Sequence, residues 1–216
     1  MAETLLLKNI SFDTLPPGTA EYSEIWKQNL SFKKGEQVLV SAPSGKGKST
    51  FIGLLYGLRR DYQGDYLIDE ENTRTFSLSR WSRLRSVEMS IVFQDLRLFG
   101  DYTGWENLAI KGKLEGSHFV RDEVSAKAAI LGIEGLLDKK TQTYSFGEKQ
   151  RLAILRALLQ PADFFVMDEP FSHLDETNRQ LALDMIQKEA AKNQSGLIIT
   201  SLGSDYGWLY DRIVVL

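Results

Sequence analysis

Short apolar runs separated by turn residues dominate the first third of the chain. Turns are predicted at Pro16-Pro17-Gly18 and Lys33-Lys34-Gly35, because proline and glycine interrupt regular structure there. Apolar runs predict strands at 5–12, 30–32 and 37–41, with these turns between them, and a further strand at 64–69. This pattern predicts an N-terminal layer rich in β-structure.

The rest of the chain changes from strand spacing to helical spacing and back. Phe51, Ile52, Leu54, Leu55 and Leu58 have helical spacing and predict a helix over 49–59. A buried strand is predicted over 89–94, and the segment from 96 to 142 is mostly helical and polar. Helices and strands then alternate at 145–159 (helix), 164–168 (strand), 175–192 (helix) and 197–201 (strand). Such alternation predicts a parallel sheet covered by helices.

Composition limits the classes of protein to consider. With 216 residues and 43% hydrophobic content, the chain fits a single domain over 1–216 with room for an inserted subdomain. A net charge of −3 and no basic tract argue against nucleic acid as the main partner. The absence of cysteine excludes disulfides, cysteine metal sites and thiol catalysis. No leader pattern and no apolar stretch of about 20 residues is present, so a role at a membrane requires another chain to supply the spans.

A glycine-containing loop joins the strand predicted at 37–41 to the helix that follows it. The loop comprises Ala42, Pro43, Ser44, Gly45, Lys46, Gly47, Lys48, Ser49 and Thr50. It matches the pattern G-x-x-x-x-G-K-[ST] except at Ala42, which is acceptable if that residue needs no positive φ. Gly45 and Gly47 allow backbone N–H groups to surround phosphate, Lys48 supplies a charge, and Ser49 offers a hydroxyl to Mg²⁺. The loop predicts a nucleoside triphosphate site; the alternative is a Gly/Ser turn before an ordinary helix.

Two adjacent acids end the strand predicted at 164–168. A site at the carboxyl end of a parallel strand suits Asp168 as a ligand of Mg²⁺ and Glu169 as the base that deprotonates an attacking water. A solvated Asp-Glu-Pro turn is the alternative.

Ser145 and Glu148 form an S-x-x-E capping box at a predicted helix start. A helix start with glycine beside the serine is also an anion site. The segment can be a helix cap and an anion site at once.

Together these motifs resemble those of the ATP-binding cassette (ABC) ATPases, over essentially the whole chain to Leu216. Besides the phosphate loop, the matching pieces are the Q-loop glutamine Gln94, the signature helix from Ser145 to Arg151, the pair Asp168-Glu169, and the D-loop Ser172-His173-Leu174-Asp175. The resemblance implies an α/β fold: a P-loop NTPase core with a mainly parallel sheet flanked by helices, an N-terminal antiparallel β layer and a helical subdomain inserted at about 96–160.

The resemblance also implies an ATPase with ATP and Mg²⁺ as cofactors. Lys48 would hold the phosphate, Glu169 would act on the water, and Gln94 would sense the γ-phosphate and Mg²⁺ together with Ser49 and Asp168. Two copies would form a head-to-tail homodimer in which Ser145 and Gly147 of one copy contact the γ-phosphate bound by the other. The D-loop residue Asp175 would line the seam between the copies.

A membrane partner follows from the same resemblance. It would dock near Leu96-Arg97-Leu98-Phe99, although these residues fit the core of a helical subdomain equally well. The chain would then be a peripheral, cytoplasmic subunit on the inner face of the cell membrane. The segment 99–108 is similar to the lipoprotein-release, macrolide-efflux and cell-division branch, in which the work is often mechanical.

The chain departs from the family at several positions. Ser201 stands where the family has a switch histidine; the two histidines are His118, a candidate solvated loop residue, and His173 of the D-loop. A serine cannot carry the charge of an imidazolium, so we expect hydrolysis that is slow or that depends on a partner. Phe146 adds bulk to the signature. The adenine-stacking aromatic has three candidates, each of which also suits packing: Phe12, Tyr22 and Trp26.

Two other functions compete with the transporter interpretation. A soluble ABC ATPase of DNA repair, chromosome structure or translation is disfavoured, because only one cassette is present and no long arm fits between Gln94 and Ser145. A nucleotide-gated scaffold with little hydrolysis remains open because of Ser201.

Overall fold

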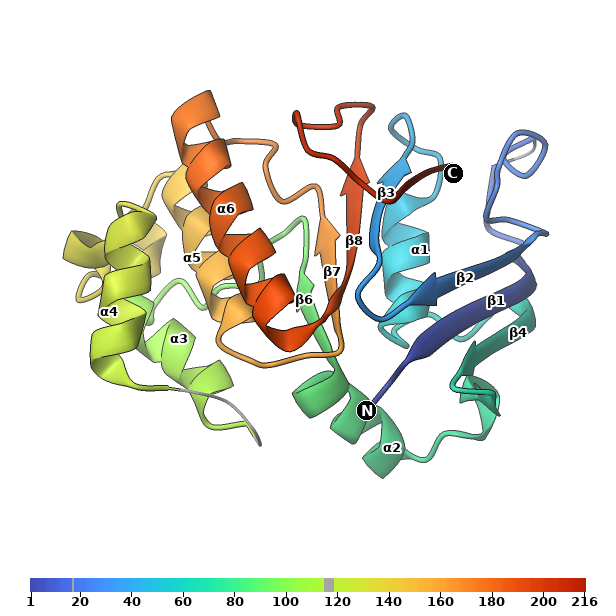
Figure 1. Ribbon diagram of the computed structural model, residues 1–216, viewed down its shortest axis with the longest axis horizontal. Helices are drawn as coiled ribbons and strands as arrows, with labels where there is room; N and C mark the ends of the chain where they lie inside the picture. The colour runs from blue at the N-terminus through green and yellow to red at the C-terminus, as the bar shows by residue number, and fades with distance from the viewer. Residues whose placement is uncertain (17, 115–118) are drawn as a thin grey trace.

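The computed structural model describes residues 1–16, 18–114 and 119–216. Two sheets lie side by side in it, and helices cover the larger sheet (Figure 1). Pro17 of the predicted first turn and His118 lie outside the described residues.

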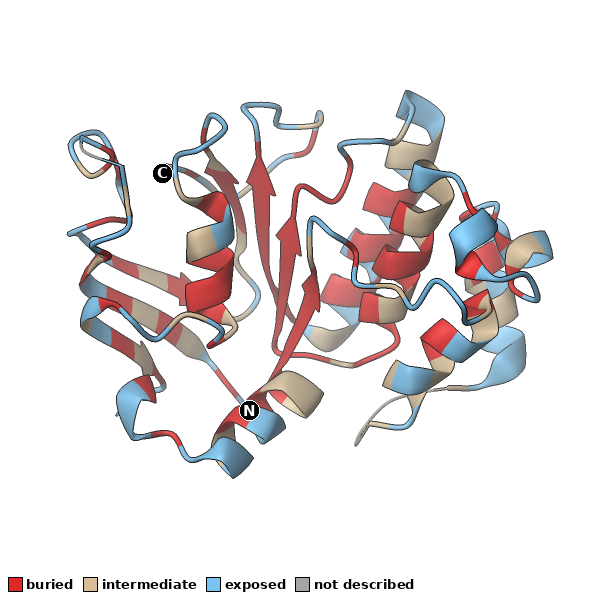
Figure 2. Cartoon of the chain, turned by 180° about the vertical axis from the view of Figure 1, so that it is seen from behind, coloured by how far each residue is buried: buried red, intermediate tan, exposed pale blue. Residues whose placement is uncertain are grey.

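A five-stranded parallel sheet forms the centre of the molecule. Its strands follow the order β6-β7-β8-β3-β9, and all neighbouring pairs are parallel. The bounds are β3 (Gln37–Ser41), β6 (Met89–Val92), β7 (Phe164–Asp168), β8 (Gly196–Ser201) and β9 (Arg212–Val215). Every residue of β6, β7 and β8 is buried, as Figure 2 shows in red, because elements pack on both faces. The predicted parallel sheet is confirmed, and its carboxyl ends share one edge.

A smaller antiparallel sheet is built from the N-terminal part of the chain. Its order is β2-β1-β4-β5, with bounds β1 (Thr4–Ser11), β2 (Asn29–Lys33), β4 (Gln63–Ile68) and β5 (Glu71–Asn72). Leu5 and Leu7 of β1 are fully buried, as the two-residue period of a strand requires. The predicted N-terminal β layer is confirmed, while the run 37–41 belongs to the parallel sheet. The two-residue strand β5 was too short to predict.

Helices lie on both sides of the parallel sheet. Their bounds are α1 (Lys48–Leu55), α2 (Leu78–Arg83), α3 (Gly104–Gly112), α4 (Arg121–Ile130), α5 (Phe146–Leu158) and α6 (Glu176–Asn193). In Figure 1, α1 lies between the two sheets, and α3 to α6 lie on the opposite side of the parallel sheet. The helix predicted over 49–59 ends early, because Gly57 turns the chain with a φ of 68°.

The central strands divide the interior into two apolar cores. Phe164 and Val166 of β7 pack with α1 and the antiparallel sheet, whereas Phe165 and Met167 pack with the helices on the other side. Alternate residues of a strand point to opposite faces, so one short strand supplies both cores.

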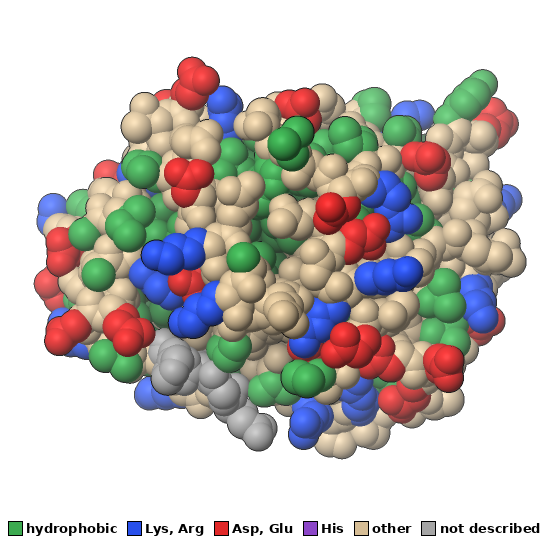
Figure 3. Space-filling model, in the orientation of Figure 1, with side chains coloured by type: hydrophobic (Ala, Val, Ile, Leu, Met, Phe, Trp, Pro, Cys, Tyr) green, Lys and Arg blue, Asp and Glu red, His purple; other side chains and the backbone are tan. Residues whose placement is uncertain are grey.

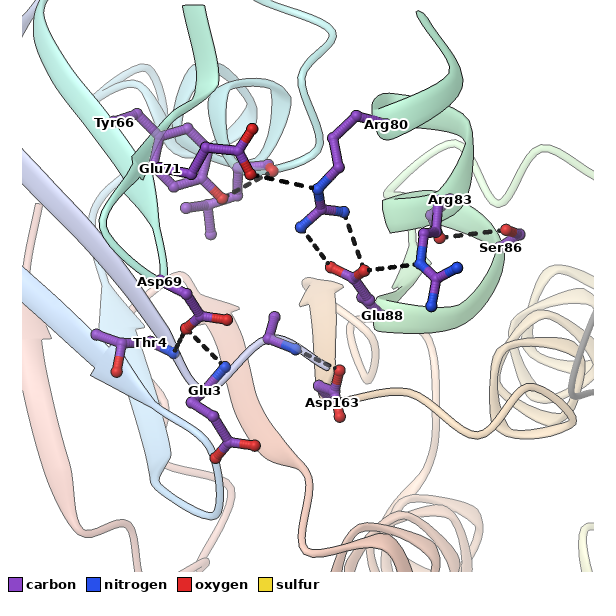
Figure 4. A network of polar contacts seen from close by, with 12 residues as sticks. Glu3, Thr4, Tyr66, Asp69, Glu71, Arg80, Arg83, Ser86, Glu88 and Asp163 are labelled. Atoms are coloured by element: carbon purple, nitrogen blue, oxygen red, sulfur yellow. Dashed lines mark hydrogen bonds and ion pairs between the residues drawn. The ribbon is translucent and has the colours of Figure 1, made fainter. Parts of the chain in front are cut away.

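A network of ion pairs fixes α2 against the strand that follows it (Figure 4). The Arg80 guanidinium donates two hydrogen bonds of 2.9 Å to the Glu88 carboxylate, and Arg83 Nε lies 3.6 Å from Glu88 Oε1. The Glu88 side chain is only 5% exposed. A π-helical turn at Leu84–Glu88 joins α2 to β6 and places this carboxylate beneath the two arginines.

Candidate functional site

The phosphate loop has the backbone geometry that its glycines predict. Gly45 has a φ of 79° and Gly47 a φ of 98°, and residues with a side chain rarely adopt these values. A Cβ at Gly47 would also lie 3.0 Å from the Leu15 side chain and 3.4 Å from the Trp26 ring. Ala42 is not among the non-glycine residues with positive φ, so it meets the condition set for replacing glycine.

Lys48 begins α1 and points back along its own loop. Its Nζ donates to the carbonyl oxygens of Ala42 at 2.9 Å and Pro43 at 3.1 Å, and lies 3.3 Å from Glu169 Oε1. The side chains of Lys48 and Glu169 are 7% and 6% exposed. The structure therefore brings two of the predicted site residues together in one buried contact.

The acidic end of β7 is held by a threonine from the neighbouring strand. Thr200 Oγ1 donates to Asp168 Oδ1 at 2.6 Å and accepts from the Glu169 amide at 3.1 Å, because β7 and β8 pair Asp168 with Thr200. Burial raises the pKa of Asp168, and the Thr200 hydrogen bond opposes that rise. Sequence reasoning missed Thr200; the signal was a polar residue at the end of an apolar strand.

A pocket beside the phosphate loop joins the three predicted metal-binding residues. Ser49, Gln94 and Asp168 line a cavity of about 260 Å³, and Gln94 Nε2 lies 3.5 Å from Glu169 Oε2. Hydroxyl, amide and carboxylate oxygens are hard donors of the kind that Mg²⁺ prefers. These residues therefore fit a Mg²⁺ ion.

The signature segment lies away from this pocket. Ser145 accepts from the Glu148 amide at 3.3 Å and Glu148 accepts from the Ser145 amide at 2.7 Å, which completes the predicted capping box at the start of α5. Ser145 is exposed, and neither it nor Gly147 lines the pocket. The Phe146 ring lies 4.2 Å from the His173 ring, centroid to centroid.

A buried glutamine connects the signature helix to the acidic strand end. Gln150 is 2% exposed; its amide donates to the Glu169 carbonyl at 3.1 Å and accepts from the His173 amide at 3.1 Å. Sequence reasoning did not single out Gln150.

The D-loop residue Asp175 caps α6. Its carboxylate accepts a hydrogen bond of 2.8 Å from the Asn178 amide, and the residue is exposed.

Ser201 is buried at the end of β8, and its hydroxyl is already bonded. It donates to the Ser204 carbonyl at 2.5 Å and accepts from the Gly203 amide at 3.1 Å.

Of the three candidates for adenine stacking, Phe12 and Trp26 pack edge-to-face in the core, while Tyr22 is 84% exposed.

Comparison with known proteins decides the family. A family model described as ABC transporter matches residues 26–172. The chain belongs to the ABC transporter family. It is 31% identical to the ABC transporter ATP-binding protein YxdL of Bacillus subtilis (strain 168), covering 87% of this chain and 73% of YxdL. It is also 31% identical to the lipoprotein-releasing system ATP-binding protein LolD of Buchnera aphidicola subsp. Schizaphis graminum, covering 81% and 77%.

Known structures agree with this assignment. The dimeric bacterial ABC transporter cassette MJ0796 superposes with a TM-score of 0.82 at 23% identity, covering 98% of this chain and 94% of that one. The fold is therefore that of an ABC cassette, as the motifs predicted. The chain is an ABC ATPase that binds and hydrolyses ATP, and its likeness to LolD agrees with the branch expected from the sequence.

Proposed function

We propose that two copies of the chain close head-to-tail around ATP and drive a separately encoded membrane protein. The observation that carries the proposal is the separation of the ATP site into two surfaces. Lys48, Glu169 and the pocket lie at one edge of the sheet, while Ser145, at the exposed start of α5, lies outside that pocket. The N-terminus of a helix suits phosphate because of its dipole and its outward N–H groups, and a second copy can present this one.

The chain's own residues have distinct tasks in this proposal. Lys48 leaves the carbonyl oxygens of its loop and binds the β- and γ-phosphates, while the Glu169 carboxylate accepts a proton from the attacking water. Gln94 links the nucleotide pocket to the segment that follows it, and Ser201 lies at the end of the neighbouring strand. Ser49, Gln94 and Asp168 would hold Mg²⁺, which neutralises phosphate charge when bound.

A groove between α2 and α3 is our proposed docking site for the membrane partner. It encloses about 410 Å³ and has an apolar floor that includes Tyr56, Trp81 and Phe93. The docking expected near Leu96–Phe99 fits this groove in part: Arg97 lines it and Phe99 is 54% exposed, whereas Leu96 is buried in the core. None of the described helices is both long and apolar enough to cross a bilayer. The proposed place of the protein is therefore the inner face of the cell membrane, where its partner holds it.

The charges of the groove favour an acidic partner segment. Among the described residues, no carboxylate lines the groove. Five cations line it: Arg60, Arg85, Arg97, Lys111 and Arg156. Arg85 donates to two carbonyl oxygens at 3.1 Å, and Arg156 donates to the carbonyls of Leu96 and Arg97. Burial lowers the pKa of Lys111 to about 8 and that of Arg156 to about 10. Carboxylates on the partner would complement these cations.

The two-copy arrangement is tested by ATP-dependent association. Glu169→Gln should bind ATP without hydrolysing it and should appear as a dimer with Mg-ATP in light scattering, while Lys48→Ala stays monomeric. Ser145→Arg should bind a fluorescent ATP analogue normally yet fail to dimerise, because the substitution lies outside its own pocket. A Ser145→Arg protein that dimerises like Glu169→Gln contradicts the head-to-tail arrangement.

Hydrolysis rates distinguish a motor from a scaffold. The wild type should exceed Glu169→Gln in ATP turnover when the membrane partner is present, since Glu169 lies beside Lys48 in the site. Equal rates would rule out the motor.

A further inference from the structure

The backbone of Glu169 has a conformation that glutamate rarely adopts. Its φ is 48°, in the left-handed region that residues other than glycine, asparagine and aspartate seldom occupy. Glu169 directly follows the last residue of β7, so this conformation turns the chain at the edge of the sheet where Lys48 lies. A rare conformation of this kind persists only where the surrounding structure holds it. The direction of the Glu169 carboxylate therefore depends on the contacts that hold its backbone.

Hydrogen bonds hold Glu169 on both sides of its Cα atom. On the N-terminal side, its amide donates to Thr200 Oγ1 at 3.1 Å. On the C-terminal side, its carbonyl oxygen accepts from Gln150 Nε2 at 3.1 Å and from the Ser172 amide at 3.3 Å. The Ser172 bond closes the turn that Glu169 itself begins, so of these two donors only Gln150 belongs to another element, α5.

Gln150 contacts both ends of that turn. Its Nε2 also donates to Ser172 Oγ at 3.3 Å, and its Oε1 accepts from the His173 backbone amide at 3.1 Å. A side-chain amide has two N–H hydrogens and one carbonyl oxygen, so each of the three bonds uses a different hydrogen or the oxygen. Because Gln150 is only 2% exposed, losing these bonds would leave buried polar groups without partners.

We propose that Gln150 is a positioning residue for hydrolysis. It holds the backbone of Glu169 in the left-handed conformation and so keeps the carboxylate where Glu169 Oε1 lies 3.3 Å from Lys48 Nζ. The inference rests on the proposed function, in which Glu169 accepts the proton of the attacking water. Gln150 does not line the pocket and acts through Glu169 alone. Without Gln150, the carboxylate occupies its position for less of the time, so hydrolysis slows while ATP binding persists.

Gln150→Met tests the proposal, because methionine is similar in length to glutamine and forms none of the three hydrogen bonds. Radiolabelled ATP detects even slow turnover by the isolated protein. We expect kcat to fall about tenfold, with KM and the Kd for a fluorescent ATP analogue within about twofold of the wild type. Hydrogen–deuterium exchange should be faster in a peptide that covers 169–173 and unchanged in one that covers the phosphate loop.

Gln160→Met is the matched control. Gln160 is also a fully buried glutamine, just after α5, but its side chain bonds to Lys111 and to the Arg85 carbonyl. It should lower the melting temperature, as Gln150→Met does, and keep the wild-type kcat. An equal loss of kcat in both variants would show that Gln150 only stabilises the fold, and would overturn the proposal. So would a loss of ATP affinity as large as the loss of kcat.

Gln150→Asn decides the matter if Gln150→Met does not fold. Asparagine keeps an amide in the same interior but is one methylene too short to reach both the Glu169 carbonyl and the His173 amide. Its kcat should also fall with KM unchanged.

Glu169→Gln in the same assay separates two kinds of failure. If Glu169→Gln turns over ATP like the wild type, Glu169 is not the base and the proposed function fails. If Glu169→Gln loses its turnover while the folded Gln150 variants keep the wild-type kcat, the proposed function stands and Gln150 does not position Glu169.

Discussion

At the scale of single residues, Thr200 holds the acidic end of β7 in place. Its hydroxyl bonds to both the Asp168 carboxylate and the Glu169 amide. Thr200→Val keeps the shape of the side chain but leaves a buried acceptor and a buried donor without this partner, which costs about 1–3 kcal/mol of unfolding free energy. Urea unfolding measures this loss.

The same substitution has a predictable pH effect. The Thr200 hydrogen bond lowers the pKa of Asp168, so its removal raises that pKa further. Because Mg²⁺ needs the ionised carboxylate, the acid limb of the pH–rate profile should move to higher pH in Thr200→Val. Thr200→Ser keeps the hydroxyl and should retain the wild-type profile. An identical acid limb in the wild type, Thr200→Val and Thr200→Ser would show that the Thr200 hydroxyl does not lower the pKa of Asp168.

Sequence motifs predicted which residue types form the site, but not how their hydroxyls point. Lys48 and Glu169 meet as the order of strand, loop and helix implies, because parallel strands bring their carboxyl ends to one edge. The hydrogen bond from the Ser201 hydroxyl to the Ser204 carbonyl depends on a loop with three positive-φ residues. No periodic pattern encodes such a loop, so the bonds of the Ser201 and Thr200 hydroxyls were found only in three dimensions.

At the scale of elements, the position of α2 depends on the buried carboxylate of Glu88. Glu88→Gln removes the buried charge to which the Arg80 guanidinium donates two hydrogen bonds, and we expect a loss of about 2 kcal/mol in unfolding free energy. Glu71→Gln is the matched control, since Glu71 is half exposed and lies 3.7 Å from Arg80. Urea unfolding measures both losses. Equal destabilisation by the two substitutions would show that the buried Glu88 carboxylate stabilises the protein no more than the exposed Glu71 carboxylate does.

The long strands and helices followed from apolar periodicity, whereas α2 did not. Its six residues include Arg80 and Arg83 and have little periodic apolar content. Contacts with Glu88 and packing of the Trp81 ring hold this helix, and both are tertiary effects.

At the scale of the whole molecule, the cationic groove predicts how the membrane partner is recognised. On the face drawn in Figure 3, hydrophobic, basic and acidic side chains are interspersed. A synthetic amphipathic peptide with two glutamates beside its apolar face should bind about fivefold more tightly than the same peptide with glutamines, as measured by fluorescence anisotropy. Charge complementarity with Arg60, Arg85 and Arg97 is the reason.

Charge reversal at the groove provides the control. Arg60 lies over the Trp81 ring at 5.0 Å, and Arg60→Glu should abolish the preference for the acidic peptide. Arg121→Glu reverses a charge on α4, outside the groove, and should leave the preference intact. Equal affinity of both peptides for the wild type would mean that the partner is not chosen by charge.

The two apolar cores on either side of the parallel sheet have a consequence for how the chain tolerates change. Phe164 and Val166 belong to one core, and Phe165 and Met167 belong to the other. The sheet thus acts as a partition between a compartment built around the nucleotide loop and a compartment of surrounding helices. Because the sheet separates the two compartments, we expect a cavity made among the helices to disturb the nucleotide loop less than a cavity of the same size made beneath α1.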